Sequence, residues 1–257
     1  MSGPFGSQQF MYKAGAKGAV DLLEEDADSD TFVCEFTGTG NETGAGAGLS
    51  GSNLILTEAG TVSDASDGWR TLNDGAFRPT QAWIDHFFAS NSGNERTLAM
   101  HLKNITVDAT TAGETNGLFN WVGSPATGAW YLYIPNSGGS ANKLKITNMT
   151  GNAYVGIGNN DSWYSDSLFA SDAEIWICWW QDGTYDRVGW VEGSDAPSKW
   201  SDFDSGKRTS ASFNGAYASG VTSAANYGFG INNGSIVGRF DINRIVMSLS
   251  GSLIEND

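Results

Sequence analysis

Short segments of alternating apolar and polar residues, separated by polar turns, predict a protein built from β-strands. The alternation is clearest at Thr97–Lys103, where Leu98, Met100 and Leu102 share one face of the predicted strand. His101 lies on the opposite, polar face, so we expect its side chain to face solvent or a shallow groove.

Two further strands depart from simple alternation. Ala173–Trp180 is apolar on both faces, which predicts a central strand covered from both sides. In Arg239–Leu249 the apolar positions change phase near Asn243–Arg244, which predicts a β-bulge. The full set of predicted strands is Thr31–Phe36, Asn53–Leu56, Trp83–Phe88, Thr97–Val107, Gly117–Val122, Trp130–Ile134, Lys143–Thr147, Ala153–Ile157, Ala173–Trp180, Arg187–Glu192, Tyr227–Ile231 and Arg239–Leu249.

Glycine makes up 34 of the 257 residues, well above its usual share, which indicates many turns. The glycine-rich segment Gly38–Gly51 is predicted to be a mobile loop or hairpin tip that packs no core. Helical periodicity is confined to Ala19–Glu25, which is too short for an independent helix. We therefore expect an all-β fold, an antiparallel two-sheet β-sandwich at residues 29–257, preceded by an extended N-terminal arm at residues 1–28.

Several segments from about Thr97 onward carry a family resemblance. They are TLAMHLKNITV, GLFNWVG followed by GAWYLYI, EIWICWWQDGTYDRVGWVEGS, and FGINNGSIVGRFDINRIVMSLS. Their order resembles the laminin-G-like, concanavalin A-like jelly-roll superfamily, in which the third piece is a strand pair joined by an Asp-Gly turn, here Asp182–Gly183. The resemblance implies a jelly-roll sandwich but no single activity, because this fold hosts lectins, glycanases, lyases and structural modules.

The opening segment, SGPFGSQQFMYKAG, resembles the first residues of many tailed-bacteriophage proteins. The resemblance implies a virion protein on the particle surface, whose partners are other subunits of the capsid or tail. Phe5, Phe10 and Tyr12 would anchor the arm to those subunits, since aromatic side chains supply large contact areas at low entropic cost. A homo-oligomer is also expected, because symmetric assembly is common in virions.

The charge balance narrows the possible partners. Acidic residues outnumber basic ones by 29 to 14, for a formal net charge of −15, so we expect no nucleic-acid partner. We expect neither membrane insertion nor conventional secretion, since the chain has no apolar stretch of about 20 residues and its start lacks a signal peptide. Cys34 and Cys178 lie in apolar segments and are predicted to be buried free thiols, with a disulfide across the sandwich as the alternative.

The sequence lacks the usual catalytic signatures. A family-16-type glycoside hydrolase would show Glu-x-Asp-x-x-Glu on one strand, and no such strand is present. There is also no nucleophile elbow, His-Glu-x-x-His motif or phosphate-binding loop. His101, Tyr131 or Tyr133 could act as the base of a lyase, but sheet-face packing explains the two tyrosines more simply. We therefore expect a non-enzymatic protein.

The polar loop Gly158–Leu168 has the composition of a sugar-binding site. Trp163 and Tyr164 lie there among carboxylates and amides. Aromatic rings can stack on a sugar ring, and carboxylates and amides can form hydrogen bonds with its hydroxyls. The alternative is that Trp163 folds back to cap the edge of the sandwich. A second, weaker candidate lies in the loop around Trp200. The predicted sugar-binding residues are Asn160, Asp161, Trp163, Tyr164 and Trp200.

Calcium is the cofactor that such acidic loops would take, because it prefers carboxylate, carbonyl and amide oxygens. The candidate ligands are Asp161, Asp166, Asp182 and Asp186. Their spacing matches no known calcium loop, so solvated turn aspartates are the alternative.

Three functional hypotheses follow. The leading one is a non-enzymatic virion protein, a decoration or appendage, whose jelly-roll module binds surface glycans. The second is a structural cement or adaptor protein that binds no sugar. The third, a glycan-degrading enzyme, is disfavoured by the missing carboxylate pair.

Overall fold

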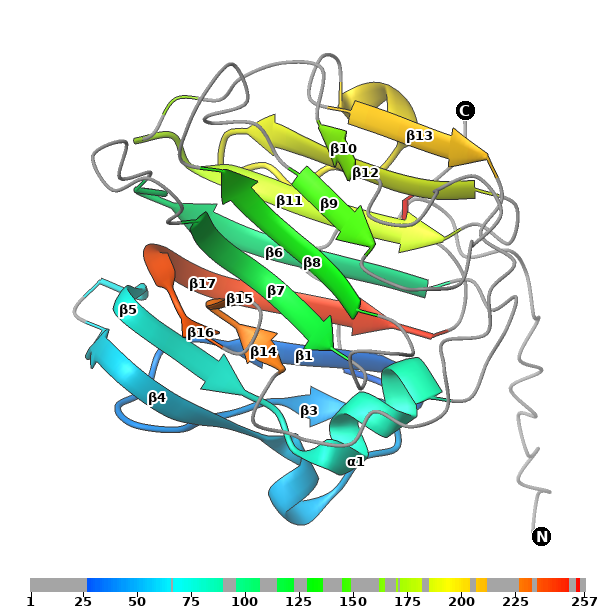
Figure 1. Cartoon of the computed structure of the whole chain (residues 1–257). Helices are drawn as coiled ribbons and strands as arrows, with labels where there is room; N and C mark the ends of the chain where they lie inside the picture. Colours follow the sequence, from blue (N-terminus) through cyan, green and yellow to red (C-terminus); the bar gives the residue numbers. More distant parts are fainter. Residues whose placement is uncertain are drawn as a thin grey trace, which may run out of the picture.

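The computed structural model describes residues 27–65, 67–89, 96–106, 115–122, 129–135, 145–148, 162–164, 170, 172–181, 185–203, 207–211, 227–232, 235–249 and 253–254 (Figure 1). Its strands are β1 (Thr31–Glu35), β2 (Glu42–Thr43), β3 (Ala45–Gly46), β4 (Ile55–Ser63), β5 (Arg70–Arg78), β6 (Arg96–Lys103), β7 (Thr115–Val122), β8 (Ala129–Pro135), β9 (Lys145–Asn148), β10 (Ser162–Tyr164), β11 (Ile175–Gln181), β12 (Tyr185–Glu192), β13 (Lys207–Ala211), β14 (Gly228–Phe229), β15 (Ile231–Asn232), β16 (Ser235–Ile236) and β17 (Gly238–Ser248). The helical elements are α1 (Gln81–Ile84), a π-helical turn (Asp85–Ala89), and 3-10 turns at Gly51–Leu54 and Trp200–Asp202.

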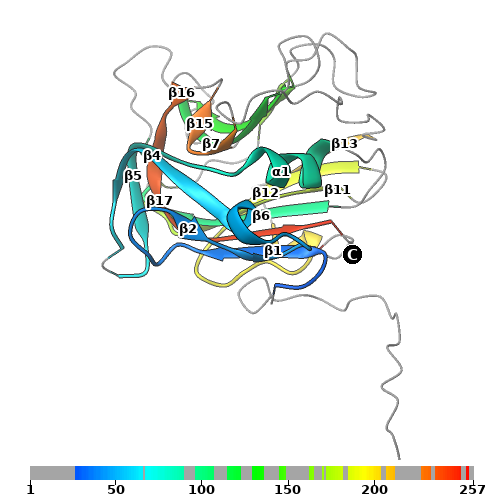
Figure 2. The same ribbon diagram turned by 90° about the horizontal axis from the view of Figure 1, so that it is seen from below.

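One bent sheet forms most of the two layers of the fold, and β15 and β16 pair as a separate two-stranded sheet. The strand order of the bent sheet is β10-β9-β8-β7-β14-β5-β17-β6-β11-β12-β13, with β1 paired to β17 and β4 paired to β5. Every described pairing is antiparallel. In Figure 2, β7 and β15 lie in one layer, and β1, β17, β6 and β11 lie in the other. The expected all-β, sandwich-like fold is confirmed.

The main core lies between these layers. Leu98, Met100 and Leu102 of β6 are fully buried in it, as the alternation predicts. The β17 strand shifts register against β6 between Ile242 and Arg244, which confirms the predicted bulge.

A second, smaller core covers the outer face of the β17-β6-β11 layer. Trp176, Cys178 and Trp180 of β11 are buried there together with Phe203. Leu253 and Ile254, near the C-terminus, pack into the same cluster. The prediction that β11 is covered from both sides is therefore confirmed.

The two cysteines are free and buried, as expected. Cys34 belongs to the main core and Cys178 to the outer one, so the sheet itself separates the two thiols. This placement argues against the alternative of a disulfide across the sandwich. Burial raises the pKa of both thiols far above the ordinary value.

The predicted strand at Trp83–Phe88 is wrong, because this segment is helical. Thr80 caps its start by accepting a hydrogen bond from the Trp83 backbone N–H at 3.2 Å. The Trp83 and Phe87 rings, four residues apart, then meet on one helix face with centroids 4.5 Å apart. Burying both rings in the core outweighs the strand propensity of the aromatic run.

The prediction for Gly38–Gly51 is also wrong in part. The segment holds β2 and β3, and Ala47 is fully buried in the main core. Arg70 organises it: the guanidinium donates hydrogen bonds to the backbone oxygens of Gly38 and Gly40 and pairs with Glu42. A buried cation thus supplies the order that the glycine-rich composition does not predict.

Other strand boundaries differ from expectation. In the predicted strand Asn53–Leu56, the first two residues belong to a 3-10 turn and the last two begin β4, and the long strand β5 was not predicted. The predicted strand Ala153–Ile157 and the short periodic segment Ala19–Glu25 lie outside the described residues, as does the predicted arm except for residues 27 and 28. Within the described part of the chain, no helix has the length and apolar character needed to cross a membrane.

Candidate functional site

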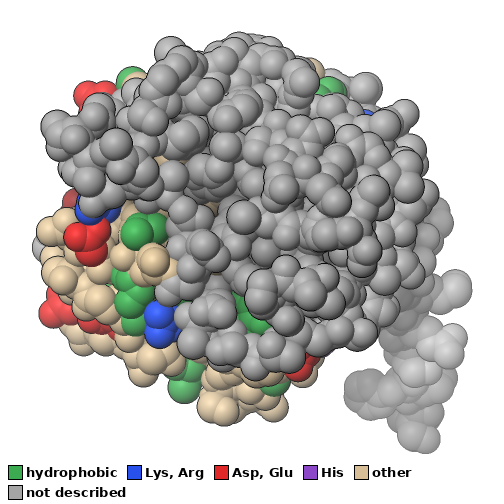
Figure 3. Space-filling model, viewed as in Figure 1, with side chains coloured by type: hydrophobic (Ala, Val, Ile, Leu, Met, Phe, Trp, Pro, Cys, Tyr) green, Lys and Arg blue, Asp and Glu red, His purple; other side chains and the backbone are tan. Residues whose placement is uncertain are grey.

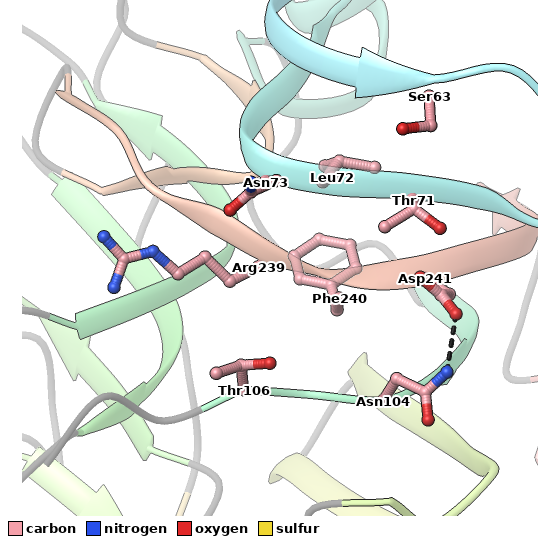
Figure 4. A pocket seen from close by; sticks show the side chains of 9 residues that line it. All are labelled: Ser63, Thr71, Leu72, Asn73, Asn104, Thr106, Arg239, Phe240 and Asp241. Carbon is pink, nitrogen blue, oxygen red and sulfur yellow. Dashed lines mark hydrogen bonds between the residues drawn. The ribbon is translucent and has the colours of Figure 1, made fainter.

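A polar groove lies where β4, β5 and β17 meet the segment that follows β6 (Figure 4). Its volume is about 490 Å³, within the usual size range of small-molecule sites. The nine lining residues are Ser63, Thr71, Leu72, Asn73, Asn104, Thr106, Arg239, Phe240 and Asp241. On the face shown in Figure 3, the described surface is mostly polar, with scattered acidic, basic and hydrophobic side chains.

Strand register brings the polar lining residues together. Thr71 of β5 lies opposite Asp241 of β17, and Asn73 lies opposite Arg239. Residues directly opposite on antiparallel strands point to the same face of the sheet. The intervening Leu72 and Phe240 are buried in the main core, so the polar residues of both strands lie on the outer side.

Two polar contacts shape the sides of the groove. Asn104 donates from Nδ2 to Oδ2 of Asp241 at 2.7 Å, the bond drawn in Figure 4. Asn104 adopts a left-handed backbone conformation with φ 52°, which asparagine tolerates better than most residues. Arg239 donates from Nε to Oδ1 of Asp74 at 2.7 Å.

Asn116 of β7 holds the groove together from beneath. Its Nδ2 donates to the backbone oxygens of Thr106 at 2.9 Å and Arg239 at 2.7 Å. Its Oδ1 accepts from the Arg239 backbone N–H at 3.0 Å. The side chain is 3% exposed, so these three bonds preorganise two lining residues from within the protein.

An aromatic cluster adjoins the groove through Lys103, which lies opposite Asp241 in the β6–β17 register. The Lys103 ammonium stands 4.3 Å from the ring centroid of Trp69. The Trp69 ring meets His101 edge-on at 4.8 Å, and His101 in turn stacks on Trp176.

The expectation that His101 faces solvent or a shallow groove is therefore wrong: the residue is 5% exposed. The side chains of Trp69 and Trp176 cover the outer face of β6 at this point. Nε2 of His101 lies 2.9 Å from Oε1 of Glu174, and Nδ1 lies 3.3 Å from Oδ1 of Asn243. Burial lowers the pKa of His101 below its ordinary value, against the opposing effects of Asn243 and Glu174.

The groove is equipped for hydrogen bonding. It combines a carboxylate, a guanidinium, two amides and three hydroxyls, which together can donate to and accept from a hydroxyl-rich ligand. Of the nine lining residues, only Asp241 carries a carboxyl group. Hydrolysis of a glycosidic bond by the usual mechanism requires a pair of carboxyl groups.

The calcium prediction stays open. Asp186 lies in β12 opposite Ser210, whereas Asp161, Asp166 and Asp182 fall outside the described residues. Among the described residues, no group of three or more histidine, cysteine, aspartate or glutamate side chains could hold a metal ion.

Trp200, the one predicted sugar-binding residue whose side chain the structure describes, does not line the groove. The backbones of Trp163 and Tyr164 form β10, paired with β9, while Asn160 and Asp161 lie outside the described residues, as do the predicted anchors Phe5, Phe10 and Tyr12.

Trp200, the weaker sugar-binding candidate, lies in a 3-10 turn beside the outer core. It is half-buried and packs edge-on against Trp180, with ring centroids 5.2 Å apart. The Arg187 guanidinium lies 4.8 Å from the Trp200 ring centroid. Trp200 thus covers part of the outer core.

The groove residues were not predicted. Alternation within Thr71–Asn73 and within Arg239–Asp241 does show which side chains face outward. This alternation gives no signal that the two segments are neighbours, because they belong to strands that lie far apart in the sequence.

No protein-family model matches the chain, and no curated protein matches its sequence. Three solved structures show a distant likeness. Domain 4 of AbnA, a GH43 extracellular arabinanase from Geobacillus stearothermophilus in complex with arabinotriose, is 13% identical over 76% of this chain and 79% of that one, with a TM-score of 0.45. The CBM2 module of the evolved Dit of Lactobacillus casei BL23 phage J-1 is 9% identical over 76% and 82%, with a TM-score of 0.36. The LG1-3 region of the laminin α2 chain is 13% identical over 67% of this chain and 24% of that one, with a TM-score of 0.32. The similar structures thus include phage, laminin and arabinanase domains, but at these TM-scores they establish no function for this chain.

Proposed function

We propose that this chain is a non-enzymatic, glycan-binding β-sandwich module of a bacteriophage virion, and that the groove between β5 and β17 holds the sugar. One observation carries the proposal: the groove brings Asp241, Asn73 and Arg239 of the sheet together with Asn104, which follows β6. Carboxylates and amides fixed on strands are well suited to hydrogen-bond the hydroxyls of a sugar ring.

The support for binding without catalysis is chemical. Among the lining residues that the structure describes, Asp241 is the single carboxylate, and Asn104 already hydrogen-bonds it. A glycosidase of the usual kind needs a second carboxyl group on the other side of the scissile bond. The virion context rests on the resemblance of the first residues to tailed-phage proteins.

A glycan array probed with the purified protein tests the proposal. We expect binding that is weakened in Asp241→Asn and in Asn73→Ala, and retained in Trp200→Ala, the control in the outer core. The same array with a calcium chelator tests the ion prediction, since a calcium-dependent lectin would lose binding there.

Three results would contradict the proposal. Loss of binding in Trp163→Ala but not in Asp241→Asn would place the sugar at the loop predicted from the sequence. Release of reducing or unsaturated sugar ends would show an enzyme. No binding to any glycan would favour the cement or adaptor hypothesis.

Particle attachment tests the virion assignment separately. Deleting residues 1–15, which removes Phe5, Phe10 and Tyr12, should abolish attachment to phage particles while circular dichroism shows an intact sandwich. Full attachment of the truncated protein would refute the anchoring role of these residues.

A further inference from the structure

The charges around the groove indicate which class of glycan it accepts. Resting on the proposed function, we propose that the groove selects neutral sugars and rejects anionic ones such as hexuronates and sulfated or sialylated glycans.

Among the described residues, Arg239 in the groove and Lys103 beside it each pair with a carboxylate of the protein. Arg239 bonds to Asp74 through Nε at 2.7 Å. Lys103 lies 3.5 Å from Oδ2 of Asp67. An anionic sugar would have to compete with these carboxylates for each cation, in water and at high effective dielectric, where the gain is small.

Asp241 carries the charge that remains. Its side chain is held by the neutral amide of Asn104, and the residue is 8% exposed. The described charged side chains of the groove and its ion pairs sum to one net negative charge: three carboxylates, Asp241, Asp74 and Asp67, and two cations, Arg239 and Lys103. The whole chain, at a formal net charge of −15, adds a repulsive field for any anion that approaches.

A neutral sugar avoids this penalty and gains from the same carboxylate. Its hydroxyls can donate to Asp241, and hydrogen bonds to an ionised acceptor are stronger than neutral ones. Asn104 donates to Oδ2 of Asp241, and an ionised carboxylate has further lone pairs that can accept from a ligand. A sugar carboxylate or sulfate offers only acceptors at that position and would be repelled by the like charge of Asp241.

Matched pairs of oligosaccharides test the inference: gluco-, galacto- and manno-oligosaccharides against hexuronate oligomers of the same stereochemistry. Where a neutral oligosaccharide binds, titration calorimetry should give it a dissociation constant at least about tenfold lower than that of the matching uronate. Asp241→Asn should weaken binding of the neutral sugar and reduce the affinity ratio between the neutral sugar and the uronate. Asp74→Asn removes the carboxylate partner of Arg239 and should strengthen binding of the uronate. Asn73→Ala provides a second groove variant if Asp241→Asn fails to fold.

The outcomes separate this inference from the proposed function. If a uronate binds tighter than its neutral counterpart and the binding depends on Asp241 or Asn73, the groove is a glycan site but the charge inference is overturned. If no oligosaccharide of either kind binds to the folded protein, the proposed function fails. Neutral binding that neither Asp241→Asn nor Asn73→Ala weakens would place the sugar elsewhere and overturn the inference.

Discussion

The imidazole of His101 lies flat on the indole of Trp176, with ring centroids 4.5 Å apart and ring planes 4° from parallel. The two residues are direct partners on β6 and β11, which sets the stack through strand register. On the other side of β6, Arg244 of β17 lies opposite His101. Glu174, next to the start of β11, forms a hydrogen bond with the His101 ring. A titratable ring is therefore enclosed within the outer face of the sheet.

This enclosure predicts a pH dependence of stability. Burial lowers the pKa of His101 in the folded protein, so the unfolded chain binds the proton more readily. The contribution of neutral His101 to stability is complete above pH 6.5, the ordinary value, and is lost as the pH falls through the lowered folded-state pKa. NMR titration of the His101 imidazole should give a midpoint below 6.5. In urea unfolding between pH 5 and 7.5, the free energy of unfolding should fall more steeply with decreasing pH for the native protein than for His101→Gln. An NMR titration midpoint of His101 above 6.5 would contradict the account.

Arg70 should be one of the most sensitive positions for stability. Its side chain is fully buried and pairs with Glu42 and with Glu58, the latter at 2.6 Å. Its Nε also donates to the backbone oxygen of Ser63 at 2.8 Å. Arg70→Met leaves a buried carboxylate unpaired and should lower the free energy of unfolding by about 3–5 kcal/mol.

A double-mutant cycle with urea unfolding checks that mechanism. Arg70→Met with Glu42→Gln should recover part of the loss, because no buried charge then stands alone at Glu42. If the two changes are simply additive, the loss does not come from the unpaired carboxylate.

Asn116 should act on the groove without touching a ligand. Asn116→Ala removes three hydrogen bonds to the backbone of Thr106 and Arg239, although the Arg239 carbonyl keeps a bond from the Thr106 backbone N–H at 2.9 Å. We expect a loss of about 1–3 kcal/mol in unfolding free energy. Hydrogen exchange should show faster exchange of the Arg239 amide, with the amides of β11 as the internal control. Unchanged protection of Arg239 would show that another group holds the strand there.

Gly189 should tolerate no side chain, because Phe203 packs directly over it. A Cβ on Gly189 would lie 2.6 Å from Cδ1 of Phe203, so Gly189→Ala should destabilise the protein by about 1–3 kcal/mol. Phe203→Leu in the same chain should relieve part of the clash, as measured by thermal unfolding. Gly193→Ala is the matched control for space, since its nearest neighbouring atom is the Asp195 backbone nitrogen at 4.0 Å, although its φ of 120° adds backbone strain. A thermal midpoint unchanged in Gly189→Ala would mean that Phe203 does not cover this strand in solution.

Sequence analysis predicted best those features of the strands that depend only on neighbouring residues in the sequence. The faces of β6 and β11, the bulge in β17 and the burial of both cysteines follow from patterns within ten or so consecutive residues. Two local predictions failed where tertiary contacts prevailed: the helix at Trp83, whose ring packs against Phe87 and Phe32 in the core, and the order that Arg70 brings to the glycine-rich segment.

The sequence by itself determined which residues point to opposite faces of each strand, because side chains alternate with a period of two wherever the backbone is extended. Only the tertiary structure decided which faces meet. Asp241 and Thr71 share the groove, and His101 and Trp176 share a stack, because strands far apart in the chain pair in one register. The polar face of β6 at His101 is buried for the same reason, since the side chains that cover it come from segments that local periodicity does not connect.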